Sequence, residues 1–399
     1  MIKIKVSSEK WNEIKKIHWE WYENYLEKKD IPLKDCLPNG KKNVLSFIEH
    51  YLGWDKSILE EIILAEPEML RFLAERKNIF FEQYENAKSD PVKIQKDGWK
   101  NDQERNVGQV LKEYFGYNDF EKNAFPCNGK KWGAYEFTRL LNIDVCPYCN
   151  RQYIFTINNG DGRPQIDHFY PQSDYPYLSC SIYNFIPSCP QCNLQKGDVL
   201  NKYATKTEQQ NHNEFKYDPN GRAFILYPYE DSIETKDSNG KITERKIWFS
   251  AMYGEWKKEY KLLDDSIRVQ IKKKNDPLLN DKIENSIEAF HLNELYSCHK
   301  IDMEDLFTRY RNYSKPKIDE ITKLILSEQL DIEIPELNKE QKKKLKEKLY
   351  KRVASTYTKR IKRTILGLPL GAEGKEYPLR KFKEDIIEQL DQTVKNMKK

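Results

Sequence analysis

Two Cys-x-x-Cys turns constrain this chain more than any other feature of its sequence. Cys146 and Cys149 form CPYC, and Cys189 and Cys192 form CPQC. Each turn can point two thiolates at one cation about 2.3 Å away, and two turns complete a tetrahedral site with no open position. The pattern therefore predicts a structural zinc site. Redox dithiols are the alternative, but neither turn has the strand-then-helix context of a thioredoxin-like motif.

The rest of the sequence is that of a folded cytoplasmic protein. It has 399 residues, 38% hydrophobic and 33% charged, so we expect two or three domains that need no disulfides. No apolar run approaches the ~20 residues that cross a bilayer, and the opening MIKIKVSSEKWN has no apolar signal core. We expect a cytoplasmic location, no membrane partner, and reduced thiols that are available to bind metal.

Hydrophobic periodicity predicts an α+β fold that is mostly helical around a small strand-rich centre. Helical spacing dominates the first 130 residues and resumes in NDKIENSIEAF and KPKIDEITKLILSEQL. Between Val145 and Gly197, QYIFTI and PQIDHFYP have the alternation of short strands. We expect a helical domain at 1–130, a strand-rich module at 131–200, a mixed, mostly helical segment packing on it at 201–312, and a basic helical region at 313–399.

Local signals predict several helix ends in the N-terminal part. Ser57 and Glu60 have the spacing of a capping box, whereas Ser7 and Ser8 fit only simple N-caps. Pro67 is expected to end or kink a helix, because proline cannot donate a backbone hydrogen bond.

The positive charge of the chain lies in its C-terminal part. Residues 336–399 hold 19 Lys and Arg against 9 Asp and Glu, a net charge of +10, so the other residues carry −5 of the total of +5. An apolar stripe at Leu345, Leu349, Val353, Tyr357 and Ile361 predicts an amphipathic basic helix. Its cations fit three roles: a solvated helix face, phosphate-backbone binding, or a partner-protein surface.

Polar residues suited to chemistry lie between and just after the cysteine pairs. Asp167 and His168 end an expected strand, Asn184 follows sixteen residues after the histidine, and Asn193 and Lys196 follow the last cysteine. Neighbouring residues on a strand point to opposite faces, so a carboxylate can hold a hard cation while an imidazole takes a proton. A zinc ion that only stabilised a fold would need none of these side chains.

In this order the stretch from Cys146 to Asp198 resembles the zinc-clamped HNH, or ββα-metal, endonucleases. HFYPQSDYPYLS and YNFIPSCPQCNLQKGD are similar to the branch that accompanies ATPases in bacterial anti-phage systems, including Septu-type and retron-associated nucleases. YDPNGRAFILYPYED and AFHLNELY resemble the region that follows the motif in that branch. The resemblance implies a DNA substrate, with RNA as the alternative, and an ATPase subunit encoded nearby.

The resemblance also assigns roles to single residues. It implies His168 as the general base, and Asp167 and Asn193 as ligands of a catalytic Mg²⁺ or Mn²⁺. Asn193 stands where many members have histidine, a change that hardens the ligand set. Asn184 would hold the loop that positions the histidine, and Lys196 lies close enough in sequence to favour a phosphate.

Two classes of function follow. The first is a metal-dependent endonuclease that hydrolyses phosphodiester bonds, and a conditional form of it would be held inactive by an ATPase or by the N-terminal helices. The second is a zinc-ribbon module that binds nucleic acid or protein without cleavage. The joint presence of Asp167, His168 and Asn193 favours the nuclease.

Overall fold

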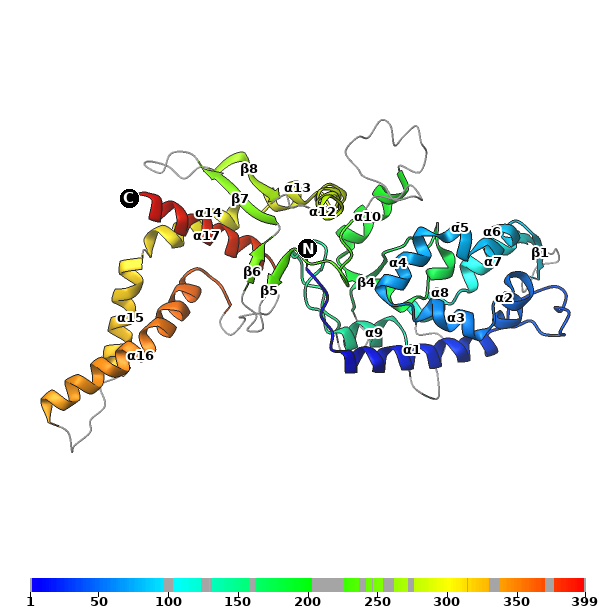
Figure 1. Ribbon diagram of the computed structural model, residues 1–399, viewed down its shortest axis with the longest axis horizontal. Coiled ribbons are helices and arrows are strands. Elements are labelled where there is room, and N and C mark those ends of the chain that lie inside the picture. The colour runs from blue at the N-terminus through cyan, green and yellow to red at the C-terminus, as the bar shows by residue number, and fades with distance from the viewer. Residues whose placement is uncertain are drawn as a thin grey trace. The chain divides into compact units, whose positions relative to one another are not determined.

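Helices make up most of the protein, and the strands of the described residues pair into two-stranded sheets (Figure 1). The fold is α+β and mostly helical, as predicted. No helix in the ranges given below is long and apolar enough to cross a membrane. The computed structural model describes residues 2–95, 103–122, 129, 131–157, 162–202, 225–236, 242–245, 247–253, 262–271, 276–313, 315–329, 338–369 and 377–397.

The chain divides into two units. Unit 1 comprises Met1–Glu234 and Lys273–Phe290, and unit 2 comprises Thr235–Lys272 and His291–Lys399. The N-terminal helices and the cysteine region thus share one unit, whereas the sequence predicted a boundary near residue 130.

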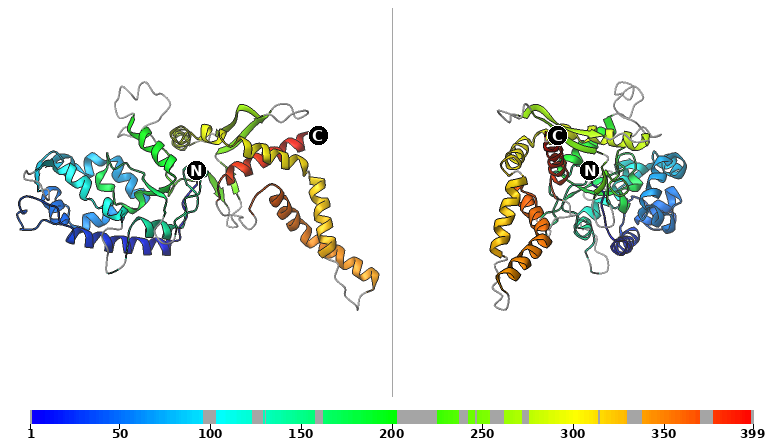
Figure 2. Two further views of the ribbon diagram at one scale, coloured as in Figure 1. Left: turned by 180° about the vertical axis from the view of Figure 1, so that it is seen from behind. Right: turned by 60° about the vertical axis from the view of Figure 1, so that its left-hand side comes forward.

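Unit 1 is built from helices that surround the cysteine region. Its helices are α1 (Ser8–Lys28), α2 (Val44–Leu52), α3 (Lys56–Ile63), α4 (Pro67–Glu75), α5 (Lys77–Phe80), α6 (Glu82–Ala87), α7 (Val107–Tyr114), α8 (Tyr117–Glu121), α9 (Ala134–Leu141), α10 (Pro190–Lys202) and α12 (Pro277–Ala289). In Figures 1 and 2, α1 runs along one side of this unit, and it contacts α2, α3 and α9.

Helix ends in unit 1 follow local chemistry, with two corrections to the sequence predictions. Ser7 caps α1 by accepting a hydrogen bond from the Lys10 amide. Asp55, not Ser57, caps α3, because its carboxylate accepts from the amide three residues later. Pro67 starts α4 instead of ending a helix, since the first turn needs no amide donor.

A buried aromatic cluster joins α1 to the cysteine region. His18 of α1 lies against Phe120, Trp132 and Phe185, with ring centroids 5.4 to 6.2 Å apart. All four side chains are buried. This packing explains the missing boundary near residue 130, because the N-terminal helices and the central strands bury their aromatic faces against each other.

The centre of unit 1 has the order strand, strand, helix. Strand β3 (Gln165–His168) pairs antiparallel with β4 (Phe185–Ser188), and α10 follows β4 and contacts β3. The loop between the strands contains the 3-10 turns η1 (Pro176–Leu178) and η2 (Ile182–Asn184). A second pair, β1 (Pro91–Ile94) and β2 (Gln103–Asn106), lies among the N-terminal helices. The segment QYIFTI forms only isolated bridges, at Tyr153 and Ile157.

Unit 2 contains more strand than the sequence predicted. Its strands are β5 (Glu234–Lys236), β6 (Ile242–Arg245), β7 (Ile247–Tyr253) and β8 (Leu262–Ile271), and its helices are α13 (Leu292–Ser297), α14 (Lys300–Asn312), α15 (Lys315–Gln329), α16 (Lys339–Ile365) and α17 (Arg380–Met397). β7 pairs with β8, α17 contacts β7, and α13 contacts β8.

The predicted basic helix is α16. Asn338 caps it by a capping box with Gln341. The apolar stripe is half-buried along its length, and α16 packs beside α15 as an antiparallel pair (Figure 2). The amphipathic pattern therefore predicted both the helix and its packed side.

Candidate functional site

The four cysteines of the two turns form one buried cluster. The sulfur atoms of Cys146, Cys149, Cys189 and Cys192 all lie within 4.8 Å of one another. Tetrahedral zinc with bonds near 2.3 Å requires sulfur atoms roughly 3.8 Å apart, and Cys149 and Cys189 are 4.0 Å apart. Four sulfurs at this spacing form a site that can bind a zinc ion.

Backbone groups hold the two turns in register. The Arg151 amide donates to Cys149 Sγ and the Cys189 amide donates to Cys146 Sγ, each at 3.4 Å. Asn150 takes a left-handed conformation with φ of 53°, which asparagine tolerates well. The Arg151 side chain also hydrogen-bonds Gln191 and so links one turn to the other.

Burial and mutual contacts shift the pKa values of the four cysteines in opposite directions. Burial raises the pKa of Cys146, whereas hydrogen bonds from the other three thiols and from the Arg151 amide lower the pKa of Cys149. As thiolates, the four buried sulfurs would repel one another strongly, and a divalent cation between them would offset that repulsion.

Asp167 lies in a buried interface between β3 and α10. Its Oδ1 accepts a hydrogen bond from Lys196 Nζ at 3.0 Å, and its Oδ2 accepts one from the Tyr148 hydroxyl at 2.6 Å. Lys196 also donates to the His168 carbonyl at 2.6 Å and is only 1% exposed. The sequence suggested a phosphate contact for Lys196, and in the structure α10 packs this side chain inward against β3.

Asn193 belongs to the same interface. Its Nδ2 donates to Gln165 Oε1 at 2.9 Å. Gln165 and Asp167 are two residues apart on β3, and Asn193 and Lys196 are three apart on α10, so each pair shares one face of its element. The Asn193–Gln165 and Lys196–Asp167 contacts therefore join one face of β3 to one face of α10. Asn193 and Asp167 thus lie in the same interface.

His168 points away from that interface, as strand alternation predicts. Its Nε2 lies 2.9 Å from the Ser179 carbonyl oxygen, so Nε2 carries the proton and donates it. Its ring lies edge-on to Tyr117 at 4.3 Å and to Phe185 at 5.5 Å. Gln172 Nε2 lies 3.2 Å from the same ring nitrogen.

This arrangement leaves Nδ1 of His168 as the basic nitrogen. Within the described part of the chain, Nδ1 makes no hydrogen bond. Burial lowers the pKa of His168 to about 4, against the opposing effect of the Ser179 carbonyl, and the Lys196 charge lowers it further. The imidazole is therefore neutral at pH 7 with an unprotonated Nδ1, and the same burial makes it a weaker base than a free imidazole.

Asn184 holds the loop that follows His168. Its Oδ1 accepts from the Tyr170 amide at 2.7 Å, and its Nδ2 donates to the carbonyls of Tyr170 and Leu178 at 3.0 and 2.9 Å. Its own carbonyl accepts from the Phe169 amide at 2.9 Å. The side chain is fully buried, so these bonds fix the loop without a role for solvent.

Three site residues had no signal in the sequence. Tyr148 lies inside the CPYC turn and binds Asp167, Gln165 binds Asn193, and Tyr117 packs on His168. Of these, only Tyr148 could have been found from the sequence, because a residue between the two cysteines of the CPYC turn must lie beside the cysteine cluster.

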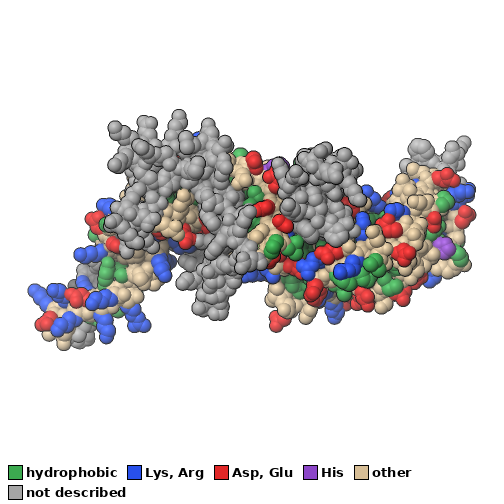
Figure 3. Space-filling model, turned by 45° about the horizontal axis from the view of Figure 1, so that its top comes forward, with side chains coloured by type: hydrophobic (Ala, Val, Ile, Leu, Met, Phe, Trp, Pro, Cys, Tyr) green, Lys and Arg blue, Asp and Glu red, His purple; other side chains and the backbone are tan. Residues whose placement is uncertain are grey.

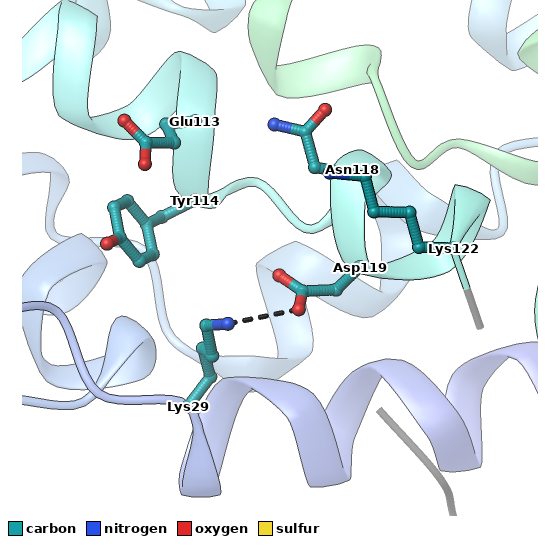
Figure 4. A pocket seen from close by; sticks show the side chains of 6 residues that line it. All are labelled: Lys29, Glu113, Tyr114, Asn118, Asp119 and Lys122. Carbon is teal, nitrogen blue, oxygen red and sulfur yellow. Dashed lines mark hydrogen bonds and ion pairs between the residues drawn. The ribbon is translucent and has the colours of Figure 1, made fainter. Parts of the chain in front are cut away.

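A polar pocket of about 230 Å³ lies beside α8 and is lined by Asn118 and Asp119 of that helix (Figure 4). In it Lys29, at the end of α1, pairs with Asp119 at 3.0 Å. The pair fixes α8, which carries Tyr117 against His168. The pocket contains none of the residues that the sequence singled out. Its lining residues are Lys29, Glu113, Tyr114, Asn118, Asp119 and Lys122.

Comparison of the chain with protein-family models, with curated proteins and with solved structures finds no match. Within the described residues, the four cysteines are also the only group of three or more His, Cys, Asp or Glu side chains that could hold a metal. The chemistry of the site is therefore argued from its own residues.

Proposed function

We propose that this protein is a metal-dependent endonuclease of the HNH type that hydrolyses phosphodiester bonds of DNA. One observation carries the proposal: His168 is held by a backbone carbonyl at Nε2 and has Nδ1 as its basic nitrogen. The packed His18 also donates from Nε2 to a carbonyl, but its Nδ1 accepts from Trp132, whereas Nδ1 of His168 makes no hydrogen bond within the described residues, as a general base requires. The strand, strand, helix order beside a four-cysteine cluster gives further support.

The proposed divalent ion would be held by Asp167 and Asn193. A carboxylate and an amide oxygen are hard donors that suit Mg²⁺ or Mn²⁺, and Mg²⁺ commonly takes one or two protein ligands and completes its shell with water and phosphate. The Asn193 amide nitrogen is bonded to Gln165, which leaves its oxygen as the donor. When bound, the ion would supply charge that stabilises the phosphate and the leaving oxygen.

The chain's own residues would then move the proton. His168 Nδ1 takes a proton from water as the water oxygen forms a bond to phosphorus, and the bond from phosphorus to the 3′ oxygen breaks in line. The leaving oxygen takes its proton from solvent. Asn184 and the Ser179 carbonyl keep the imidazole in position throughout.

The biological setting is proposed from the sequence resemblance alone. We propose a cytoplasmic anti-phage nuclease that works with an ATPase subunit encoded nearby. RNA is the alternative substrate, because the proposed chemistry acts on the phosphodiester and not on the base.

A binding module without cleavage is the second candidate, and the Lys196 contact favours it. The ammonium already neutralises the Asp167 carboxylate, so the site needs no cation to be stable. Such a module would hold zinc and bind nucleic acid or protein, but it would not respond to Mg²⁺.

Cleavage assays decide between these candidates. Supercoiled plasmid, linear duplex, single strands and tRNA are incubated with Mg²⁺ or Mn²⁺ and with wild type, His168→Ala, or His50→Ala, whose exposed histidine serves as the control. The nuclease proposal expects cleavage by wild type and the control, and at least a hundredfold slower cleavage by His168→Ala with its zinc retained. Equal rates for all three proteins would refute the assignment of His168.

A further inference from the structure

One helix carries the entire positive surplus of this chain. α16 contains twelve Lys and Arg and two Glu, a net charge of +10, whereas the rest of residues 336–399 is neutral. The helix has 27 residues and is therefore about 40 Å long. Its partner α15 has three Lys and three acidic residues, so the charge belongs to α16 alone.

Some of the cations of α16 share one exposed side of the helix. Four of them, Lys348, Lys351, Arg352 and Lys359, are exposed and fall within one side of the helical wheel, and we call them the α16 basic face. In the described chain none of the four pairs with a carboxylate. Figure 3 shows blue Lys and Arg side chains crowded at the end of unit 2 where α16 lies.

The opposite side of α16 is already occupied. α15 packs against α16, every residue of the apolar stripe is half-buried, and at the margin between the two sides the Thr358 hydroxyl lies 3.3 Å from the Thr322 hydroxyl. A helix that inserts into a membrane surface must keep its apolar side open. Because α15 packs on α16, a lipid surface is a poor ligand for this helix. The α16 basic face remains exposed to solvent.

We propose that the α16 basic face binds the phosphate backbone of a nucleic-acid duplex without regard to sequence. Its residues span about 16 Å, since each residue of a helix rises 1.5 Å, and this row of cations matches the closely spaced charges of a duplex. Single strands are bound through exposed aromatic rings, and the α16 basic face has none. The inference goes beyond the proposed function, because it concerns where the nucleic acid binds and needs no cleavage.

Salt-dependent binding of the full chain tests this proposal. A quadruple variant replaces the α16 basic face with glutamine, which keeps helix propensity. Anisotropy with labelled 30-base-pair DNA, the same RNA duplex and the single strand is measured from 50 to 300 mM salt with no added divalent ion. We expect roughly tenfold to hundredfold weaker duplex binding near 100 mM salt, and a salt slope that is shallower by about one for each lost phosphate contact.

A matched control removes the same charge from unit 1. Lys16, Lys28, Lys41 and Lys112 are exposed, and their replacement by glutamine should leave the slope as in wild type. The inference is wrong if the quadruple α16 variant keeps the wild-type slope, or if the two quadruple variants lose binding equally. Preference for the single strand, or binding only to an acidic protein, would also overturn it. Because the binding assay contains no divalent ion, failure of the proposed cleavage would leave this result unaffected.

Discussion

Asp167 and Lys196 form a buried ion pair, with Nζ 3.0 Å from Oδ1 and side chains that are 6% and 1% exposed. Removal of one partner from such a pair leaves an uncompensated charge away from water. The same carboxylate is the proposed ligand of a catalytic cation, so a bound ion would compete with the ammonium for it. The proposed function therefore couples stability to metal affinity at this position.

Lys196→Met is expected to lower the free energy of unfolding by about 3 kcal/mol when no divalent ion is added, because Asp167 loses its partner. Added Mg²⁺ should then raise the unfolding temperature of the variant more than that of wild type. Calorimetry with and without Mg²⁺ measures both effects. Asp167→Asn combined with Lys196→Met should abolish the Mg²⁺ response, and an equal response in all proteins would contradict metal binding by Asp167.

The cysteine cluster predicts one zinc ion per chain, bound independently of the catalytic ion. Cys192→Ser removes one of the four sulfurs and should lose the zinc and destabilise the β3, β4 and α10 region, because the two turns are no longer held together. Metal analysis of the purified protein and hydrogen exchange measure these effects. Cys298→Ser alters an exposed cysteine and should keep full zinc content. Stoichiometric zinc in Cys192→Ser would contradict a four-cysteine site.

The features that the sequence predicted are those that local spacing determines. The cysteine pairs, the opposite directions of Asp167 and His168, and the apolar stripe of α16 each depend on a repeat of two to four residues. Such repeats depend on neighbouring residues and not on tertiary contacts, so a single sequence is enough to find them.

The features that were missed depend on contacts between distant segments. Lys196 has the charge to bind phosphate, but its direction is set by the packing of α10 on β3. The packing of His18 in α1 on Phe185 in β4 is likewise a contact between distant segments, which no local pattern predicts. The cap of α3 was also assigned to the wrong residue. Asp55 and Ser57 both have side chains that suit an N-cap, and which of them caps the helix depends on the residue at which the helix begins.

The two asparagines of the site should respond to mutation in opposite ways. Asn184→Ala removes three buried hydrogen bonds, to the Tyr170 amide, the Tyr170 carbonyl and the Leu178 carbonyl, which should cost about 2–4 kcal/mol of stability. Asn193→Ala affects a side chain at the edge of the β3 and α10 interface and should leave stability nearly unchanged while it weakens Mg²⁺ binding. Denaturant unfolding and Mg²⁺ titration separate the two effects. Equal loss of stability in both variants would contradict the separate roles.

His18 gives the fold a dependence on pH that is separate from the candidate site. The Trp132 indole donates to its Nδ1 at 3.1 Å, so its Nε2 donates to the Cys180 carbonyl at 2.8 Å and the ring is neutral. Burial lowers the pKa of His18 to about 4 from 6.5, although the Cys180 carbonyl opposes the shift. In the unfolded chain His18 therefore binds a proton below pH 6.5, whereas in the folded chain it binds one only below about pH 4.

The contribution of neutral His18 to stability is complete above pH 6.5 and is lost as the pH falls toward 4, by about 3 kcal/mol in total. Urea unfolding of wild type and His18→Gln at half-unit steps from pH 7.5 to 4 measures it as the difference between the two curves. The variant should be less stable at pH 7, and the difference should shrink as the pH falls, since glutamine does not titrate. His50→Gln changes an exposed histidine and should run parallel to wild type. A constant difference between wild type and His18→Gln would show that His18 titrates alike in the folded and unfolded chain.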